Sequence, residues 1–209
     1  MKKEVAILLT LVCLSTTIFA EGNFGGKAQF GYPIYAGVED YLPDAQQDFS
    51  YNSNISAFFE FIVNDYFGIQ LEAGITMKNI DYISFYPDSW EMLYFPIYAK
   101  CKIPTDFTEY YFMAGPSMHV VLEGPYMFFG DPYKEIHNDV LFGYSFEGGV
   151  SLPLFPGGDS FVFGIHYNAH FNKPYSDLNL DIIDFDLVLA YSANTRDFTT
   201  THGFGRNLQ

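Results

Sequence analysis

Apolar and polar residues alternate with a period of two along most of the chain. Between residues 67 and 78, every odd position is apolar, from Phe67 to Met77, and every even position is polar or glycine, from Gly68 to Lys78. Successive side chains of a β-strand point to opposite faces of a sheet. The segment therefore predicts a strand with one apolar face and one polar face.

The same alternation recurs in seven other segments. Each covers about the 9–11 residues that a tilted strand needs to cross a bilayer. The eight predicted strands cover residues 27–37, 55–63, 67–78, 93–102, 109–120, 140–151, 161–171 and 183–192.

The connections between these strands differ in length in a regular way. Short turns at residues 64–66, 104–107 and 153–159 alternate with longer connections at residues 39–52, 79–91, 123–139 and 172–181. Short turns at one rim and long loops at the other are typical of outer-membrane barrels. The pattern predicts an all-β fold, an eight-stranded antiparallel up-and-down transmembrane β-barrel.

The first twenty residues have the layout of a secretory signal peptide. Lys2 and Lys3 form a basic head, an apolar run covers residues 5–19, and Ala20 is a small residue at the expected cut. The run is too short for a transmembrane helix, which needs about 20 apolar residues. We therefore expect a signal peptide over residues 1–20, a barrel over residues 21–192 and a polar C-terminal tail over residues 193–209.

Composition and charge narrow the class of protein further. Aromatic residues make up 20% of the chain, and no apolar run of helix-spanning length follows Ala20. This combination is typical of membrane β-barrels. The formal net charge of −15 repels phosphate backbones, so nucleic acid is not an expected partner.

Alternation alone does not decide which face of the barrel points outward. A soluble lipocalin-like barrel, which binds an apolar ligand inside its apolar face, is the alternative. The polar face favours the membrane arrangement because it is rich in glycine, which relieves crowding in a narrow barrel, and carries both signs of charge. Since an unpaired charge away from water is costly, we expect the charged residues to pair as a structural network in the lumen. They are Lys27, Glu60, Glu72, Lys78, Lys100, Lys102, Glu109, Glu147, Asp184 and Asp186.

Three short sequences resemble a known family. They are Tyr-Phe-Pro-Ile-Tyr-Ala-Lys at residues 94–100, Ala-Gly-Pro-Ser at 114–117 and Glu-Gly-Gly-Val at 147–150. Together they are similar to the small outer-membrane β-barrel superfamily that includes PorT-like and OmpX/OmpA-like barrels. The resemblance covers Gly25 to about Ser192 and implies a bacterial outer-membrane protein that contacts lipid and is assembled by the insertion machinery. One departure is the tail: such barrels end on an aromatic residue, whereas 17 residues follow Ser192 here.

The lumen is expected to be closed and without a cofactor or metal. An eight-stranded barrel has an interior just wide enough for side chains to fill, which argues against an open pore. His166 and His170 are four residues apart on one strand, roughly 13 Å at the usual rise, and too far apart to share one metal.

Ser117, His119, His166 and His170 form a candidate polar site on the lumen face. Ser117, His119 and Glu147 could in principle perform acyl transfer on a lipid, although nothing in their spacing fixes a contact between nucleophile and base. A lipid-modifying enzyme is therefore an alternative to a non-enzymatic barrel, and no catalytic residue is assigned.

The long connections are rich in aromatic and acidic residues. The aromatic residues suit an interfacial girdle, or else a recognition surface for a partner. The acidic residues suit a basic ligand or a divalent cation, although no EF-hand-like spacing defines a cation site. We predict a monomeric, non-enzymatic barrel with a structural or surface-interaction role. The aromatic residues are Tyr82, Phe85, Tyr86, Trp90, Tyr126, Phe128, Phe129 and Tyr133, and the acidic ones are Glu39, Asp40, Asp44, Asp48, Asp81, Asp88, Glu91, Glu123, Asp131, Glu135 and Asp139.

Overall fold

The computed structural model describes residues 22–36, 50–80, 88–123, 139–154, 158–173 and 181–194. These residues form eight strands, and none of them lies in a helix long and apolar enough to span a membrane. The strands are β1 (Gly22–Ala36), β2 (Tyr51–Asn64), β3 (Phe67–Ile80), β4 (Asp88–Pro104), β5 (Glu109–Glu123), β6 (Val140–Pro153), β7 (Ser160–His170) and β8 (Asp181–Asn194).

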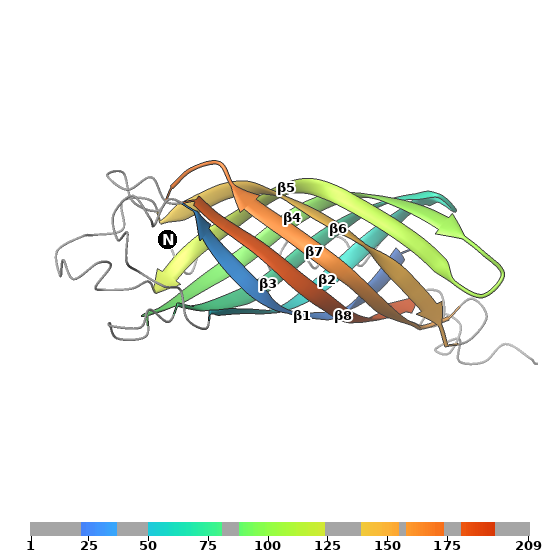
Figure 1. Ribbon diagram of the computed structural model, residues 1–209. Coiled ribbons are helices and arrows are strands. Elements are labelled where there is room, and N and C mark those ends of the chain that lie inside the picture. The colour runs from blue at the N-terminus through green and yellow to red at the C-terminus, as the bar shows by residue number, and fades with distance from the viewer. Residues whose placement is uncertain are drawn as a thin grey trace, which may run out of the picture.

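The strands form one closed antiparallel barrel (Figure 1). Each strand pairs with the next in the sequence, and β8 pairs back onto β1, from Asn23 opposite Asn194 to Ala36 opposite Asp181. Closure lets backbone groups bond between strands all round the wall, which a bilayer requires because it offers no water to them. The predicted fold class is confirmed.

The two rims of the barrel differ as predicted. The short turns at residues 65–66 and 105–108, the end of β6 and the start of β7 lie at one end, on the right of Figure 1, and we call it the inner rim. We call the opposite end, where the four longer connections join the strands, the outer rim. At the inner rim, the side-chain oxygen of Asn64 accepts hydrogen bonds from the backbone N–H groups of Tyr66 at 2.8 Å and Phe67 at 2.9 Å, which fixes the β2–β3 turn.

The apolar face of the barrel points outward. Ile55 and Leu187 are 71% and 69% exposed, whereas Lys78, on the other face, is fully buried. This is the reverse of a soluble barrel, and large apolar side chains exposed on all sides require lipid around them. The alternative of a soluble lipocalin-like barrel is therefore wrong.

Several strands are longer than predicted, which corrects the position of Trp90. Trp90 was expected in a loop, as were Asp88, Glu91 and Glu123, but β4 begins at Asp88 and β5 ends at Glu123. The Trp90 side chain is fully buried on the lumen face. Trp90 and Met92 are both apolar at inward positions, so the alternation that marks β4 from Leu93 onward is lost there. At the other end of the chain, β8 continues to Asn194, two residues beyond the predicted end. The predicted signal peptide and the rest of the tail lie outside the described residues.

The backbone pairing of β4 is interrupted on both sides at its centre. Towards β3, register partners stop at Leu71–Ile97 and resume at Gly74–Tyr94. Towards β5, they stop at Pro96–Ser117 and resume at Ala99–Ala114. Pro96 and Pro116 lie in these gaps and have no N–H to donate.

Gly115 permits the close approach of β4 and β5 at this point. A Cβ atom at position 115 would overlap the backbone carbonyl oxygen of Ile97. We expect Gly115→Ala to lower the free energy of unfolding by about 1–3 kcal/mol, because two backbones would have to separate. Urea unfolding of the protein in liposomes measures this. Gly148→Ala is the matched control, since the nearest atoms to its Cβ would lie at 3.7 Å, and equal effects of the two substitutions would contradict the prediction.

Candidate functional site

The inward side chains form three bonded clusters along the barrel axis. We call them the inner, middle and outer clusters, counted from the inner rim. The inner cluster is Asn23, Glu60, Lys100 and Lys102, and the middle cluster is Lys27, Gln29, Ser56, Gln70, Glu72, Tyr111 and Glu147. The outer cluster is Asn52, Lys78, Tyr94, Tyr98, Ser117, His119, Ser145, His166, Asn168, His170, Asp184 and Asp186.

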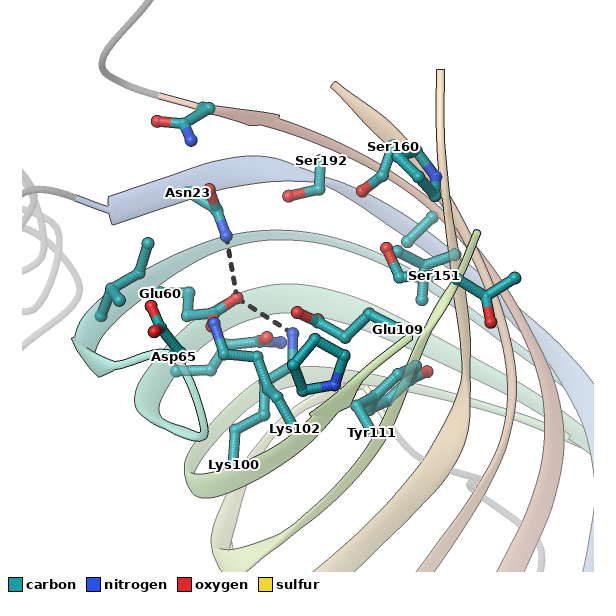
Figure 2. A pocket seen from close by; sticks show the side chains of 18 of the residues that line it. Asn23, Glu60, Asp65, Lys100, Lys102, Glu109, Tyr111, Ser151, Ser160 and Ser192 are labelled. Atoms are coloured by element: carbon teal, nitrogen blue, oxygen red, sulfur yellow. Dashed lines mark hydrogen bonds and ion pairs between the residues drawn. The ribbon is translucent and has the colours of Figure 1, made fainter. Parts of the chain in front are cut away.

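In the inner cluster, one carboxylate holds two ammonium groups. Lys102 donates to one oxygen of Glu60 at 2.7 Å, and Lys100 donates to the other at 3.0 Å. The amide of Asn23 donates to the second oxygen at 3.3 Å. Figure 2 shows these side chains converging on Glu60, with Glu109 nearby.

A cavity of about 420 Å³ opens at the inner rim, around this cluster. Its wall includes the 105–108 turn, Glu109 and the hydroxyl side chains of Ser151, Ser160 and Ser192 (Figure 2). Lys27 and Glu147 also line it, so the cavity reaches the middle cluster. The inner end of the lumen is therefore a polar vestibule.

The middle cluster is centred on Lys27, whose ammonium group donates to Glu72 at 2.6 Å and to Glu147 at 2.9 Å. The remaining oxygen of Glu72 accepts from Ser56 at 2.6 Å, and that of Glu147 accepts from Tyr111 at 2.9 Å. Every carboxylate oxygen of this cluster thus accepts a hydrogen bond, as buried charges require.

Two tyrosine rings connect the clusters. The Lys100 ammonium group lies 5.0 Å from the centroid of the Tyr111 ring, and that of Lys27 lies 5.5 Å from the centroid of the Tyr98 ring. Both are cation–π distances. Tyr111 therefore joins the inner cluster to the middle one, and Tyr98 joins the middle cluster to the outer one.

Tyr94 is the hub of the outer cluster. Its hydroxyl group lies 2.7 Å from the Tyr98 hydroxyl, 3.1 Å from Ser145 Oγ and 3.1 Å from His166 Nε2. The other ring nitrogen of His166 lies 3.0 Å from Asp186. This chain of contacts joins β4, β6, β7 and β8 across the lumen.

The outermost contacts involve an ion pair and a histidine pair. Lys78 donates to both oxygens of Asp184, at 2.6 and 2.8 Å. His119 Nδ1 lies 3.0 Å from His170 Nε2. His170 Nδ1 lies 3.2 Å from the backbone carbonyl oxygen of Ile182.

The structure gives Ser117, His119 and Glu147 separate partners. Ser117 donates to Asn168 at 2.8 Å, His119 contacts His170, and Glu147 contacts Lys27 and Tyr111. No hydrogen bond recorded among the described residues joins any two of the three. An acyl-transfer arrangement of these side chains is therefore not formed. In the same described part of the chain, no three histidine, cysteine or acidic side chains gather as metal ligands.

Sequence reasoning did not assign a role to the residues that connect the clusters. Tyr94, Tyr98 and Tyr111 stand at inward positions of the alternation, and that parity is the signal that could have found them. Nothing in the sequence indicates that Asn168 accepts hydrogen bonds from both Ser117 and Ser145, because this depends on the stagger between β5, β6 and β7.

The sequence matches no protein-family model and no curated protein. The fold is similar to several solved structures. The outer membrane protein OprG from Pseudomonas aeruginosa is 14% identical, with a TM-score of 0.49 over 85% of this chain and 96% of that one.

Two further structures are similar at the same level. Neisserial surface protein A is 15% identical, with a TM-score of 0.45 over 81% of this chain and 98% of that one. Ail, the attachment invasion locus protein of Yersinia pestis, solved in complex with the heparin analogue sucrose octasulfate, is 10% identical, with a TM-score of 0.45 over 82% and 99%. A closed barrel of eight strands, apolar outside and charged inside, is the fold of the small outer-membrane β-barrels of bacteria, and this chain has that fold.

Proposed function

We propose that this protein is a non-enzymatic outer-membrane barrel with a closed lumen, which serves as a rigid support for a surface at its outer rim. One observation carries the proposal: bonded side chains cross the lumen between strands that are not neighbours. Lys27 of β1 bonds to Glu147 of β6, Lys78 of β3 to Asp184 of β8, and Tyr94 of β4 to His166 of β7.

These cross-lumen contacts would block the passage of a solute. Each would have to break for a molecule to pass, and separating a buried ion pair costs about 3–5 kcal/mol. The vestibule at the inner rim ends at the middle cluster, where every carboxylate oxygen is bonded. Entry from the inner rim is therefore expected to stop there.

If the lumen is closed, the outer rim is the part of the barrel that can bind a partner outside the cell. Glu91 and Glu123 stand opposite each other at the outer ends of β4 and β5, and both are at least partly exposed. Like charges placed face to face are unfavourable unless a cation or a basic group lies between or near them. We propose a basic partner or a cation at this rim, consistent with the acidic sequence of the long connections, most of which lies outside the described residues.

A conductance measurement tests the closed lumen. The wild-type barrel in a planar lipid bilayer is expected to give no steady conductance, because side chains bridge the lumen at two levels. The triple substitution Lys27→Ala, Tyr94→Ala and Tyr98→Ala removes the bridges of both the middle and the outer cluster, and is expected to give measurable leak current. The exposed residues Tyr66, in the β2–β3 turn, and Tyr110, on β5, both changed to Ala, are the control. Steady conductance of the wild-type protein would refute the proposal.

A further inference from the structure

His119 and His170 form an imidazole pair in the outer cluster, in which His119 is buried and His170 is half-buried. His119 belongs to β5 and His170 to β7, so their contact passes across the inner face of β6. The two ring nitrogens are 3.0 Å apart, and the ring centroids are 4.6 Å apart at an interplanar angle of 67°.

The partners of His170 determine which nitrogen carries hydrogen. A backbone carbonyl only accepts, so His170 Nδ1, 3.2 Å from the Ile182 carbonyl oxygen, carries a hydrogen. In the neutral pair, His170 Nε2 is then the acceptor, and His119 Nδ1 donates to it. One added proton is tolerated, since either ring can donate to the other. A second added proton puts hydrogen on both facing nitrogens, so neither can accept and two positive charges meet.

The surrounding groups do not offset a second charge. Lys78, from β3, adds a positive charge nearby, and it already occupies both oxygens of Asp184. Asp186, also from β8, is bonded to His166 of β7 and to Asn52 of β2. Tyr94 of β4 stacks on His119 with a centroid distance of 4.6 Å, and at this level β6 contributes the uncharged Ser145.

The outer part of the lumen also has polar atoms ready to accept water. Ser50 Oγ, Asn52 Oδ1 and Asn54 Oδ1 are buried on the inward face at the start of β2, and they make no hydrogen bond in the structure. Each unsatisfied buried polar atom costs about 1–3 kcal/mol. The middle cluster has no such atom among its carboxylates, so entry of water is favourable in the outer cluster and not beyond it.

We propose that uptake of a second proton by the His119–His170 pair separates the two rings and admits water to the outer cluster, while the middle cluster stays closed. The outer mouth of the barrel would then respond to acidification of its surroundings. This response is separate from the surface role proposed above and does not depend on any partner.

The fluorescence of a tryptophan in the lumen can report the entry of water. Trp90 is the single tryptophan of the chain, fully buried on the lumen face of β4 and opposite Lys78 in register. Because burial and the nearby Lys78 disfavour added charge on this pair, the pH of the folded barrel in liposomes is lowered from about 8 to about 3, beyond the usual titration of histidine. We expect Trp90 emission to shift to longer wavelength and its quenching by acrylamide to increase.

Variants identify the proton-binding groups. His170→Gln and His119→Phe are expected to abolish the emission shift. Glutamine can accept and donate at any pH, and phenylalanine keeps the ring stack on Tyr94 without binding a proton. His166→Gln, within the same cluster, and His202→Gln, outside the described residues, are controls that should keep the shift. A mobility difference before and after boiling checks that each variant has folded.

Three results would overturn the inference. The first is constant wild-type emission across this pH range. The second is a shift that persists in both His170→Gln and His119→Phe. The third is steady conductance that appears only at low pH, which would show that the middle cluster does not stay closed. Conductance at every pH would instead refute the proposed closed scaffold, so failure of the two proposals can be told apart.

Discussion

Replacing Lys27 by methionine is expected to lower the free energy of unfolding by about 3–5 kcal/mol, because it leaves two buried carboxylates without their cation. Glu72 and Glu147 both bond to the Lys27 ammonium group, and all three side chains are buried. Because methionine keeps most of the length of the side chain, the substitution removes the charge and largely preserves the packing. Equilibrium unfolding by urea in liposomes measures the difference from the wild type.

Two comparisons separate charge from general disturbance. Lys173→Met removes an ammonium group that lies 3.8 Å from Asp181 on a side chain that is 34% exposed, and exposed pairs contribute about 0–1 kcal/mol. Adding Glu72→Gln and Glu147→Gln to Lys27→Met should recover much of the lost stability, since no buried charge then lacks a partner. A Lys27→Met protein as stable as the wild type would show that the middle cluster carries no buried charge to be neutralised.

Leu187→Lys is the second substitution with a large expected effect, and it tests which face contacts lipid. Leu187 lies near the middle of β8 and is 69% exposed on the outward face. A lysine facing lipid at the middle of a bilayer destabilises a barrel by about 2–4 kcal/mol, whereas near the interface the effect falls to about 0–1 kcal/mol. The same urea titration measures it.

Val63→Lys provides the depth control. Val63 is also exposed and outward, but it is next to the last residue of β2, at the inner rim. On a soluble protein, both substitutions at exposed positions would stay within about 0.5 kcal/mol of the wild type. A small and equal effect of the two lysines would therefore contradict the assignment of the outward face to lipid.

The alternation in the sequence was sufficient to predict the barrel, because strand parity is a local property. Positions 67 to 78 can be assigned to two faces without any knowledge of the other strands. Parity fails where apolar residues stand at inward positions beside polar outward ones, as Trp90 and Met92 do beside Glu91, so the true start of β4 was not visible. The sequence likewise placed ten charged residues on one face.

The partners within the lumen could not be predicted, because they depend on the stagger between strands that are far apart in the sequence. Ser117, His119 and Glu147 do share the inward face, yet each bonds to a different residue. Moving one strand by two residues would keep every side chain on its face and change all of these pairs. The role of the tyrosines also depends on this stagger. The ring of Tyr98 contacts Lys27 of β1, and the ring of Tyr111 contacts Lys100 of β4.

The centre of β4 combines weak backbone pairing with strong side-chain contacts. Around Pro96 and Gly115, register partners are missing towards β3 and β5, while Tyr94 and Tyr98 bond across the lumen to β6 and β7. Local unfolding begins where backbone hydrogen bonds are few. This weakly paired stretch of wall is therefore held from the lumen side, and we expect the phenol groups to raise the free energy at which it opens.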